Sequence, residues 1–224
     1  MSHARSQRRI FLTGATGYLG IRLIPLLLER GHDVTALARE ESLKKVPAGC
    51  RVVTGNPLDA ETFTEAVQGS DTLVQLVGVP KPSPWKGPQF RAIDGPSAIA
   101  AIRAAASMNV RHIVYVSVAH PAPIMKEYIA VRRDCESAIG AAGLVATILR
   151  PWYILGPDHW WPLALVPVYR VLERVPATRD AAMRLGLVTI REMLAALLWS
   201  IEHPPVNTRV IEVPEIRRLG RSET

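Results

Sequence analysis

The chain has 224 residues, of which 48% are hydrophobic and 21% charged, so its composition is globular and excludes intrinsic disorder. This length suits a single α/β domain, residues 1–224, with a full hydrophobic core. The formal charge is +7, but the basic residues are scattered and no helix-turn-helix, zinc-finger or RNA-binding signature accompanies them, so we expect no nucleic-acid partner.

The chain begins its ordered part with a strand, a glycine-rich turn and a helix. The apolar run at about 9–13 predicts a buried parallel strand, and residues at about 17–30 predict a helix that ends at Gly31. Glycines in the turn permit a close backbone approach, and the helix N-terminus suits a pyrophosphate. The alternative is an ordinary glycine-rich turn. The predicted cofactor-binding segment comprises Gly14, Ala15, Thr16, Gly17, Tyr18, Leu19 and Gly20.

The second predicted strand, residues 32–38, ends at Arg39. A NAD-selective site usually has an acidic residue there, about 20 residues after the glycine turn, to bind the ribose 2′-hydroxyl. A guanidinium offers a planar fork suited to phosphate, so we predict NADP(H), with NAD as the less favoured cofactor. The alternative is that Arg39, followed by Glu40 and Glu41, is a solvated loop charge.

Strands and helices continue to alternate along the chain. The pattern predicts strands at about 51–55, 71–78, 111–117 and 144–149, with helices at about 59–68, 91–108 and 124–142. Asp59 is the predicted N-cap of the first of these helices, and Gly95 and Pro96 interrupt the second early. This alternation predicts an α/β fold with a doubly wound parallel sheet.

The fourth predicted strand ends in Val77 and Gly78, beside the expected cofactor crevice. Residues 79–88 contain so many prolines that we expect a stiff loop without regular structure. Ligands bind at the carboxyl ends of parallel strands. Trp85 therefore either lines a substrate mouth or packs on its own prolines.

Beyond the sixth strand, residues at about 152–224 include a small substrate-capping lobe. Its aromatic cluster contains Trp152, Tyr153 and Trp160, and the apolar segment 162–169 is kinked by Pro167. The cluster walls a substrate pocket, docks on a partner or a membrane surface, or closes the core of the lobe. A strand at 187–189, a helix at about 190–202 and a last strand at 209–213 follow, and then a basic, frayed tail.

Cysteine usage and hydropathy indicate the cellular compartment. Cys50 and Cys135 lie far apart without metal-ligand spacing, which indicates reduced thiols and predicts no metal site. The apolar stretch after Arg8 and Arg9 is interrupted by glycines, unlike a signal peptide. No apolar run approaches the roughly 18 residues of a transmembrane helix. We therefore expect a cytoplasmic protein.

Several motifs together indicate a family. The signature Thr13–Gly20 has the extended or atypical glycine spacing, and residues 147–151 read Thr-Ile-Leu-Arg-Pro. On these residues the chain resembles an atypical member of the short-chain dehydrogenase/reductase superfamily, in the group of NAD(P)H-binding proteins similar to NmrA-like and complex-I-accessory-subunit-like proteins. The resemblance covers a core of about 9–155 and implies a Rossmann fold. It further implies that Asn56 stands in for an acidic residue near the adenine and that Pro151 passes the nicotinamide.

The catalytic motif of that family is a serine after the fifth strand and Tyr-x-x-x-Lys on the next helix. Ser117 and Tyr128 match it, but Arg132 replaces the lysine, on the same helix face. The resemblance implies that Tyr128 exchanges the carbonyl proton while Ser117 holds the carbonyl oxygen. Arg132 would bind the ribose and lower the tyrosine pKa, although arginine cannot relay protons. His120 is an alternative acid, and Tyr128 and Arg132 are alternatively an ordinary surface pair.

Two classes of function follow from these residues. The first is an NADP(H)-dependent oxidoreductase that reduces a carbonyl, enone or quinone-like small molecule. The alternative is a non-catalytic NAD(P)H-binding regulator or assembly factor. Ser117 and Tyr128 favour the enzyme, whereas Arg132 favours the regulator. Peripheral membrane contact and the oligomeric state remain open.

Overall fold

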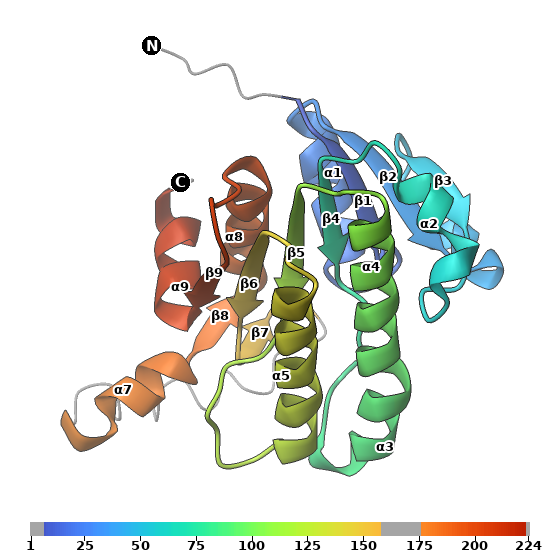
Figure 1. Cartoon of the computed structure of the whole chain (residues 1–224). Helices are drawn as coiled ribbons and strands as arrows, with labels where there is room; N and C mark the ends of the chain where they lie inside the picture. The colour runs from blue at the N-terminus through green and yellow to red at the C-terminus, as the bar shows by residue number, and fades with distance from the viewer. Residues whose placement is uncertain (1–6, 158–175, 223–224) are drawn as a thin grey trace.

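A seven-stranded parallel sheet forms the centre of the protein in the computed structural model, which describes residues 7–157 and 176–222 (Figure 1). Its strand order is β3-β2-β1-β4-β5-β6-β9, and every neighbouring pair is parallel. The predicted doubly wound sheet is therefore confirmed. The strands are β1 (Arg9–Thr13), β2 (Asp33–Ala38), β3 (Arg51–Thr54), β4 (Thr72–Gln75), β5 (His112–Val116), β6 (Ala146–Arg150) and β9 (Arg209–Glu212).

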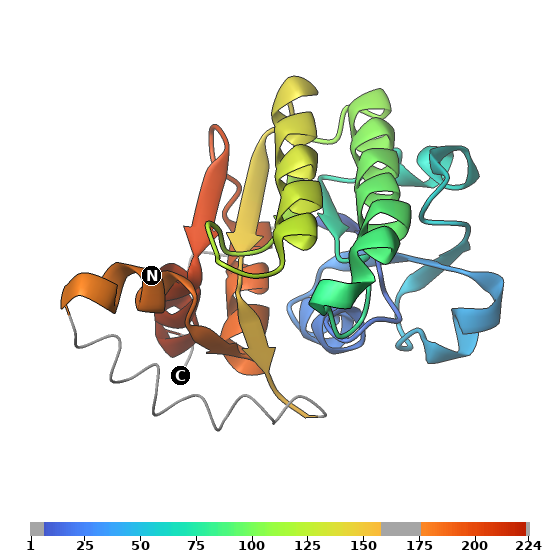
Figure 2. The same cartoon turned by 90° about the horizontal axis from the view of Figure 1, so that it is seen from below.

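Helices cover both faces of this sheet (Figures 1 and 2). One face carries α1 (Gly20–Glu29), α8 (Ile190–Glu202) and α9 (Val213–Ser222). The other carries α2 (Thr64–Val67), α4 (Gly95–Ser107) and α5 (Lys126–Ala141). None of the helices in the described residues is both long and apolar enough to cross a bilayer.

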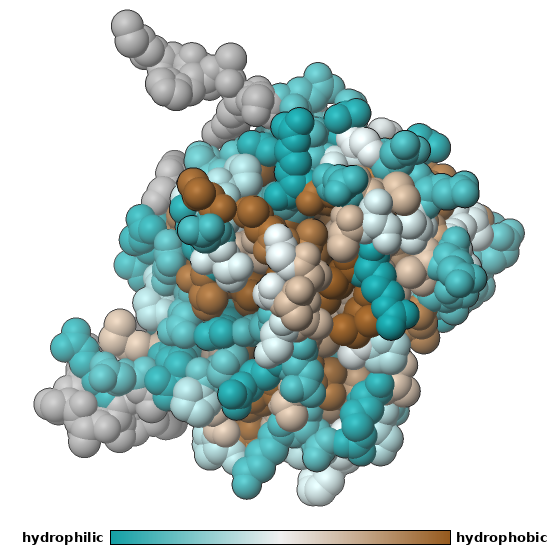
Figure 3. Space-filling model, in the orientation of Figure 1, coloured by the Kyte–Doolittle hydropathy of each residue, from teal (hydrophilic) through white to brown (hydrophobic). Residues whose placement is uncertain are grey.

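Strands β1, β2, β4, β5 and β6 supply both cores, because successive side chains point to opposite faces. In β1, Ile10 and Leu12 pack with α1 and α8, whereas Phe11 packs with α2 and α4. All three are buried, which explains why the strand reads as a continuous apolar run. On the face seen in Figure 3, apolar residues show through near α4 and α5 among hydrophilic ones.

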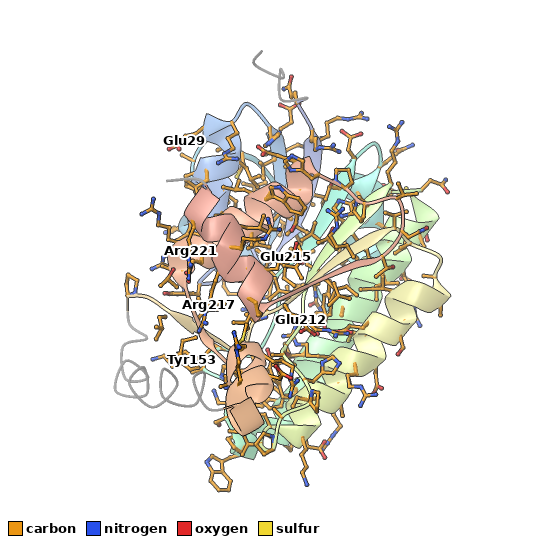
Figure 4. All side chains as sticks on the ribbon, turned by 90° about the vertical axis from the view of Figure 1, so that its left-hand side faces the viewer. Glu29, Tyr153, Glu212, Glu215, Arg217 and Arg221 are labelled. Carbon is orange, nitrogen blue, oxygen red and sulfur yellow. The ribbon has the colours of Figure 1, made fainter. Side chains whose placement is uncertain are left out.

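A second, two-stranded parallel sheet lies beside the main one and forms part of the C-terminal lobe. It pairs β7 (Tyr153–Leu155) with β8 (Leu187–Thr189), and α7 (Pro176–Arg184) precedes β8. The sequence pattern did not indicate β7. Figure 4 shows Arg217 of α9 on the same side of the molecule as Tyr153. The predicted roles of Trp160 and of segment 162–169 lie outside the described residues.

The proline-rich loop is more regular than predicted. Residues 79–88 contain a 3₁₀ turn, η3 (Pro84–Lys86), and lead into α3 (Gly87–Gln89). The helix predicted at about 91–108 also continues through Gly95 and Pro96. A π-helical turn, η4 (Phe90–Asp94), connects α3 to α4 there. Proline in a regular helix clashes with the carbonyl four residues earlier, and a wider turn relieves that clash.

Two further expectations about helices were wrong in part. Asp59 does cap the segment after β3, but that segment is a 3₁₀ turn, η2 (Ala60–Thr62), followed by the single-turn α2. Residues after β9 are not frayed, because they form α9 and bury Val213, Ile216 and Leu219 against α8 and β8. Another 3₁₀ segment, η1 (Glu40–Lys45), follows β2.

Candidate functional site

The glycine turn lies where the strand order reverses. β1 and β4 are neighbours, and the helices that follow them, α1 and α4, lie on opposite faces of the sheet. Such a switch point leaves a crevice at the carboxyl ends of the two strands, where doubly wound sheets bind their ligands. The turn after β1 and the loop after β4 therefore face the same crevice.

The glycines of this turn fill places that no other residue fits. Gly14 has φ +75°, and a Cβ there would lie 2.8 Å from the backbone carbon of Leu76. A Cβ at Gly20 would overlap the carbonyl oxygen of Gly14. The Gly17 N–H donates to that same carbonyl at 3.0 Å, which closes the turn. The backbone therefore requires glycine at positions 14 and 20, and these two positions place no side chain in the crevice.

The first turn of α1 is suited to an anion. Its N-cap is Leu19, which makes no side-chain capping bond, and its first turn carries no acidic residue. The N–H groups of Ile21, Arg22 and Leu23 already donate to the carbonyls of Gly17 and Leu19. The attraction for negative charge therefore comes from the positive end of the helix dipole. An anionic pyrophosphate thus fits the residues present.

Polar side chains buried beneath the turn connect it to α4. Thr13 and Gln75, at the ends of β1 and β4, form a short side-chain hydrogen bond. The Gln75 amide donates to Ser97 Oγ at 3.2 Å, and that hydroxyl donates to the Asp94 carbonyl at 3.1 Å. The sequence analysis missed this chain, because a lone buried threonine or glutamine has no spacing signature.

A cavity of about 610 Å³ opens at this edge and joins three groups of residues. The glycine turn and the loop after β4 form one side. The predicted catalytic residues Ser117, Tyr128 and Arg132 form the second. The third is the strand exit after β6, with Pro151, Trp152, Tyr153 and Ile154. Predicted residues from distant parts of the chain, Gly14, Gly17, Tyr18, Leu19 and Gly78 among them, therefore line one cavity.

Arg132 is not a surface residue. Only 5% of it is exposed, and its guanidinium forms an ion pair with the fully buried Asp94. It also donates to the Val116 carbonyl at 2.7 Å and to the Tyr115 hydroxyl at 3.4 Å. Asp94 in turn accepts from the Val79 N–H at 3.0 Å. The sequence analysis missed Asp94, because 38 residues separate the two partners.

The half-buried Tyr128 lies against this ion pair. The Arg132 guanidinium carbon is 5.0 Å from the centre of its ring, and the ring of Phe90 is at 4.7 Å. Burial raises the pKa of Tyr128, and the Asp94 carboxylate raises it further, so Arg132 only partly offsets them. Arg132 does lower the tyrosine pKa as expected, but burial outweighs it, and the net direction is a rise. Tyr128 is a neutral phenol, able to donate a proton.

Ser117 belongs to a second polar cluster. Its hydroxyl donates to Glu136 Oε1 at 2.5 Å, and the same carboxylate accepts two hydrogen bonds from Arg150, one of them from Nε at 3.1 Å. Because the Ser117 hydroxyl proton is used in the hydrogen bond to Glu136, only the lone pairs of Oγ face the cavity that Ser117 lines. Glu136 belongs to no motif, and Arg150 was identified only as part of the motif at residues 147–151, without its partner.

Three further residues predicted to bind the cofactor follow β2, β3 and β4. Arg39 follows β2, and its exposed side chain pairs with Glu41 at 3.0 Å. The Asn56 side chain accepts from the Leu58 N–H at 3.1 Å, so its carboxamide oxygen is already used in a turn. Gly78 lies against Arg132, where a Cβ would be 2.5 Å from Nη2.

The structure separates two predicted pocket residues from the cavity. Trp85 is 88% exposed, so it neither lines the cavity nor packs on its own prolines, although Pro80 and Pro82 of the same loop do line it. His120 precedes a cis bond to Pro121 and contacts the Val118 carbonyl at 3.1 Å, outside the cavity lining. Within the described part of the chain, no three His, Cys, Asp or Glu side chains gather as a metal site.

Comparison with known proteins gives a family and several relatives. A family model described as NAD(P)H-binding matches residues 14–158. Among curated proteins, ceramide reductase of Caulobacter vibrioides is 26% identical over 217 residues, which are 96% of this chain and 67% of the relative. A farnesyl-dihydroquinoline-1-oxide ketoreductase of Stigmatella aurantiaca is 29% identical over 171 residues, 67% of this chain and 51% of the relative. The chain thus spans one half to two thirds of these relatives.

The fold has a counterpart among solved structures. The Bordetella bronchiseptica enzyme WbmG, solved in complex with NAD, superposes with a TM-score of 0.68 at 19% identity. The likeness covers 99% of this chain and 78% of that one. At such low identity the comparison establishes the Rossmann-type fold and nothing about the substrate.

Proposed function

The chain belongs to the NAD(P)H-binding family, and from this premise we propose that it is an NADP(H)-dependent oxidoreductase that reduces a carbonyl, enone or quinone-like small molecule. The observation that carries the proposal is the single cavity of about 610 Å³ shared by the glycine turn, Tyr128 and Ser117. A cofactor and a substrate held there would meet beside a tyrosine that still carries its proton.

The residues divide the work of binding and proton transfer. The glycine turn and the N-terminus of α1 would hold the pyrophosphate, and the exits of β5 and β6 would hold the nicotinamide half. When bound, the cofactor supplies a hydride. Tyr128 then donates its phenolic proton to the substrate oxygen. The Ser117 hydroxyl donates to Glu136, so to donate to a substrate carbonyl oxygen it must first turn away from that carboxylate.

Arg39 supports the preference for NADP(H). It stands at the carboxyl end of β2, next to β1 and the glycine turn. Its present partner Glu41 is as exposed as Arg39 itself, and such surface pairs contribute only about 0–1 kcal/mol. The guanidinium can therefore exchange this carboxylate for a 2′-phosphate at little cost in free energy.

The proposed substrate is largely apolar. Leu76, Val79, Val118, Trp152 and Ile154 line the cavity, and large apolar surfaces bind apolar ligands. The names of the two relatives, a reductase of ceramide and a ketoreductase of a farnesylated quinoline, agree with a bulky apolar carbonyl compound.

Turnover of NADPH with a panel of apolar ketones, enones and quinones tests the proposal. Tyr128→Phe should lower the rate by about 10²-fold or more while NADPH binding, followed by fluorescence titration, is retained. Tyr115→Phe is the matched control, because Tyr115 also contacts Arg132 but does not line the cavity. Equal rates for wild type and Tyr128→Phe would refute the assigned proton donor.

A second candidate is a non-catalytic NAD(P)H-binding regulator or assembly factor. It is favoured by Arg132, whose guanidinium is bonded to Asp94 and to the Val116 carbonyl instead of serving a proton relay. A chain that binds NADPH but oxidises it with no member of the panel would support this function.

A further inference from the structure

Arg132 lies between two tyrosine rings and is held at its edge by one carboxylate. Its guanidinium carbon is 5.6 Å from the ring centre of Tyr115 and 5.0 Å from that of Tyr128. Nη2 pairs with Asp94, while Nη1 is bonded to the Val116 carbonyl. Asp94 therefore fixes the position of the guanidinium and reduces the positive potential that Arg132 produces at Tyr128.

Asp94 is itself fixed by the fold. It lies in η4, the wide turn that precedes α4, and it is fully buried. Its Oδ2 accepts the Val79 N–H at 3.0 Å, and its own carbonyl accepts the Ser97 hydroxyl. A carboxylate held by its partners in this way keeps its position, and it brings a full negative charge to the buried guanidinium.

We infer that Asp94 is a positioning residue, which holds Arg132 against β5 and cancels its charge so that Tyr128 remains a neutral phenol in the cavity. The inference rests on the proposed function, because it assigns a residue that acts together with burial to keep the proton donor protonated. A cation without a counterion beside a tyrosine would favour the phenolate. Here an anion accompanies the cation, which suits a site that starts with its proton in place.

The other groups around Tyr128 do not replace this pair. Tyr115 faces Arg132 from β5, and burial raises its pKa well above the ordinary value. Lys81 lines the same cavity from the loop after β4. Arg91 of η4 and Glu127 of α5 form an exposed ion pair with each other. Among the described groups facing the ring, Asp94 and Arg132 are thus the buried pair of opposite charges.

A pH titration of tyrosinate absorbance tests the inference without a substrate. The signal of Tyr128 is the difference between each protein and its Tyr128→Phe counterpart. In Asp94→Asn the uncompensated Arg132 should lower the midpoint by about one pH unit or more. In Arg132→Met the uncompensated Asp94 should raise it. The double variant, which lacks both charges, should titrate close to the wild type.

The order of the midpoints decides the outcome. A midpoint in Asp94→Asn that equals that of the wild type, or that stays hidden by alkaline unfolding, overturns the inference. Thermal unfolding establishes first which variants fold. If Asp94→Asn does not fold, the test compares Arg132→Met with the double variant, and equal or hidden midpoints in that pair also overturn it.

The titration separates this inference from the proposed function. The predicted order of midpoints in a chain that never oxidises NADPH would refute the reductase and leave the charge arrangement in place. NADPH oxidation by a chain whose Tyr128 midpoints do not differ between variants would support the reductase and refute the charge arrangement. A merely structural Asp94 would change the unfolding temperature of the variants but leave the Tyr128 midpoint where it is.

Discussion

The half of the sheet around β1 contributes backbone to the cavity, whereas the half around β5 contributes side chains. In the first half, Gly14, Gly17 and Gly20 shape a turn and expose the N-terminus of a helix. In the second half, two buried or half-buried ion pairs, Asp94 with Arg132 and Glu136 with Arg150, orient the polar groups. The half around β1 depends on glycines that have no side chain. The half around β5 depends on ion pairs between residues that are distant in sequence.

Gly14→Ala should give the largest effect, because it places an atom where the backbone half needs space. A positive φ costs a non-glycine residue about 1–3 kcal/mol, and overlap with Leu76 adds a similar amount, so we expect a loss of about 4 kcal/mol of unfolding free energy. NADPH binding should be lost as well. Denaturant unfolding and fluorescence titration measure the two effects.

The control for this substitution is Gly140→Ala. Gly140 lies within α5, and a Cβ there would meet nothing within 4 Å. Alanine is the better helix former, so this variant should be more stable by about 0.5–1 kcal/mol and should keep its NADPH affinity. A Gly14→Ala protein that still binds NADPH would contradict the backbone half of the comparison.

His112 of β5 should make the stability of the protein depend on pH. The imidazole contacts Thr147 Oγ1 at 2.9 Å, and burial together with Arg8 and Arg209 lowers its pKa to about 4. The unfolded chain, with a histidine pKa of about 6.5, binds the proton first. Stability should therefore fall as the pH drops from about 6.5 to 4, by about 3 kcal/mol in total.

Denaturant unfolding of wild type and His112→Asn at neutral pH and near pH 4 isolates this contribution. The stability difference between the two proteins should shrink, or change sign, at the lower pH. Parallel pH dependence in both proteins would show that His112 is not the group responsible.

Arg39→Ala should give the smallest effect, and it distinguishes general from selective binding. The glycine turn serves any dinucleotide, whereas a single exposed side chain selects the phosphate. We expect about a tenfold loss in NADPH affinity, about 1.4 kcal/mol, with little change for NADH. Arg51→Ala is the matched control, since Arg51 begins β3 and so lies at the amino end of a strand, away from the carboxyl ends that face the crevice. An unchanged affinity ratio would rule out Arg39 as the selector.

The backbone half could be predicted from the sequence because its signals are local. Apolar runs marked the buried parallel strands, and the glycine spacing marked the turn between β1 and α1. The side-chain half could be predicted only as far as the motif residues Ser117, Tyr128 and Arg132. Their partners Asp94 and Glu136 lie outside any motif, and the net rise of the Tyr128 pKa was not predicted because its largest cause is the burial of the side chain, which no motif indicates.

The last helix shows a different limit. Residues 213–222 are rich in arginine and contain Gly220, which indicated a tail. Val213, Ile216 and Leu219 nevertheless follow a three-residue spacing and are buried. So narrow an apolar stripe becomes meaningful only once a partner, here α8, is known.

Gly78 limits which residues can stand at position 132. Its missing side chain is the space that the Arg132 guanidinium occupies, and Asp94 closes the same space from η4. The residues at positions 78, 94 and 132 are therefore sterically dependent on one another, because a side chain at position 78 would overlap the guanidinium. A homologue that carries a larger residue at position 78 should have a slimmer cation, or none, at position 132.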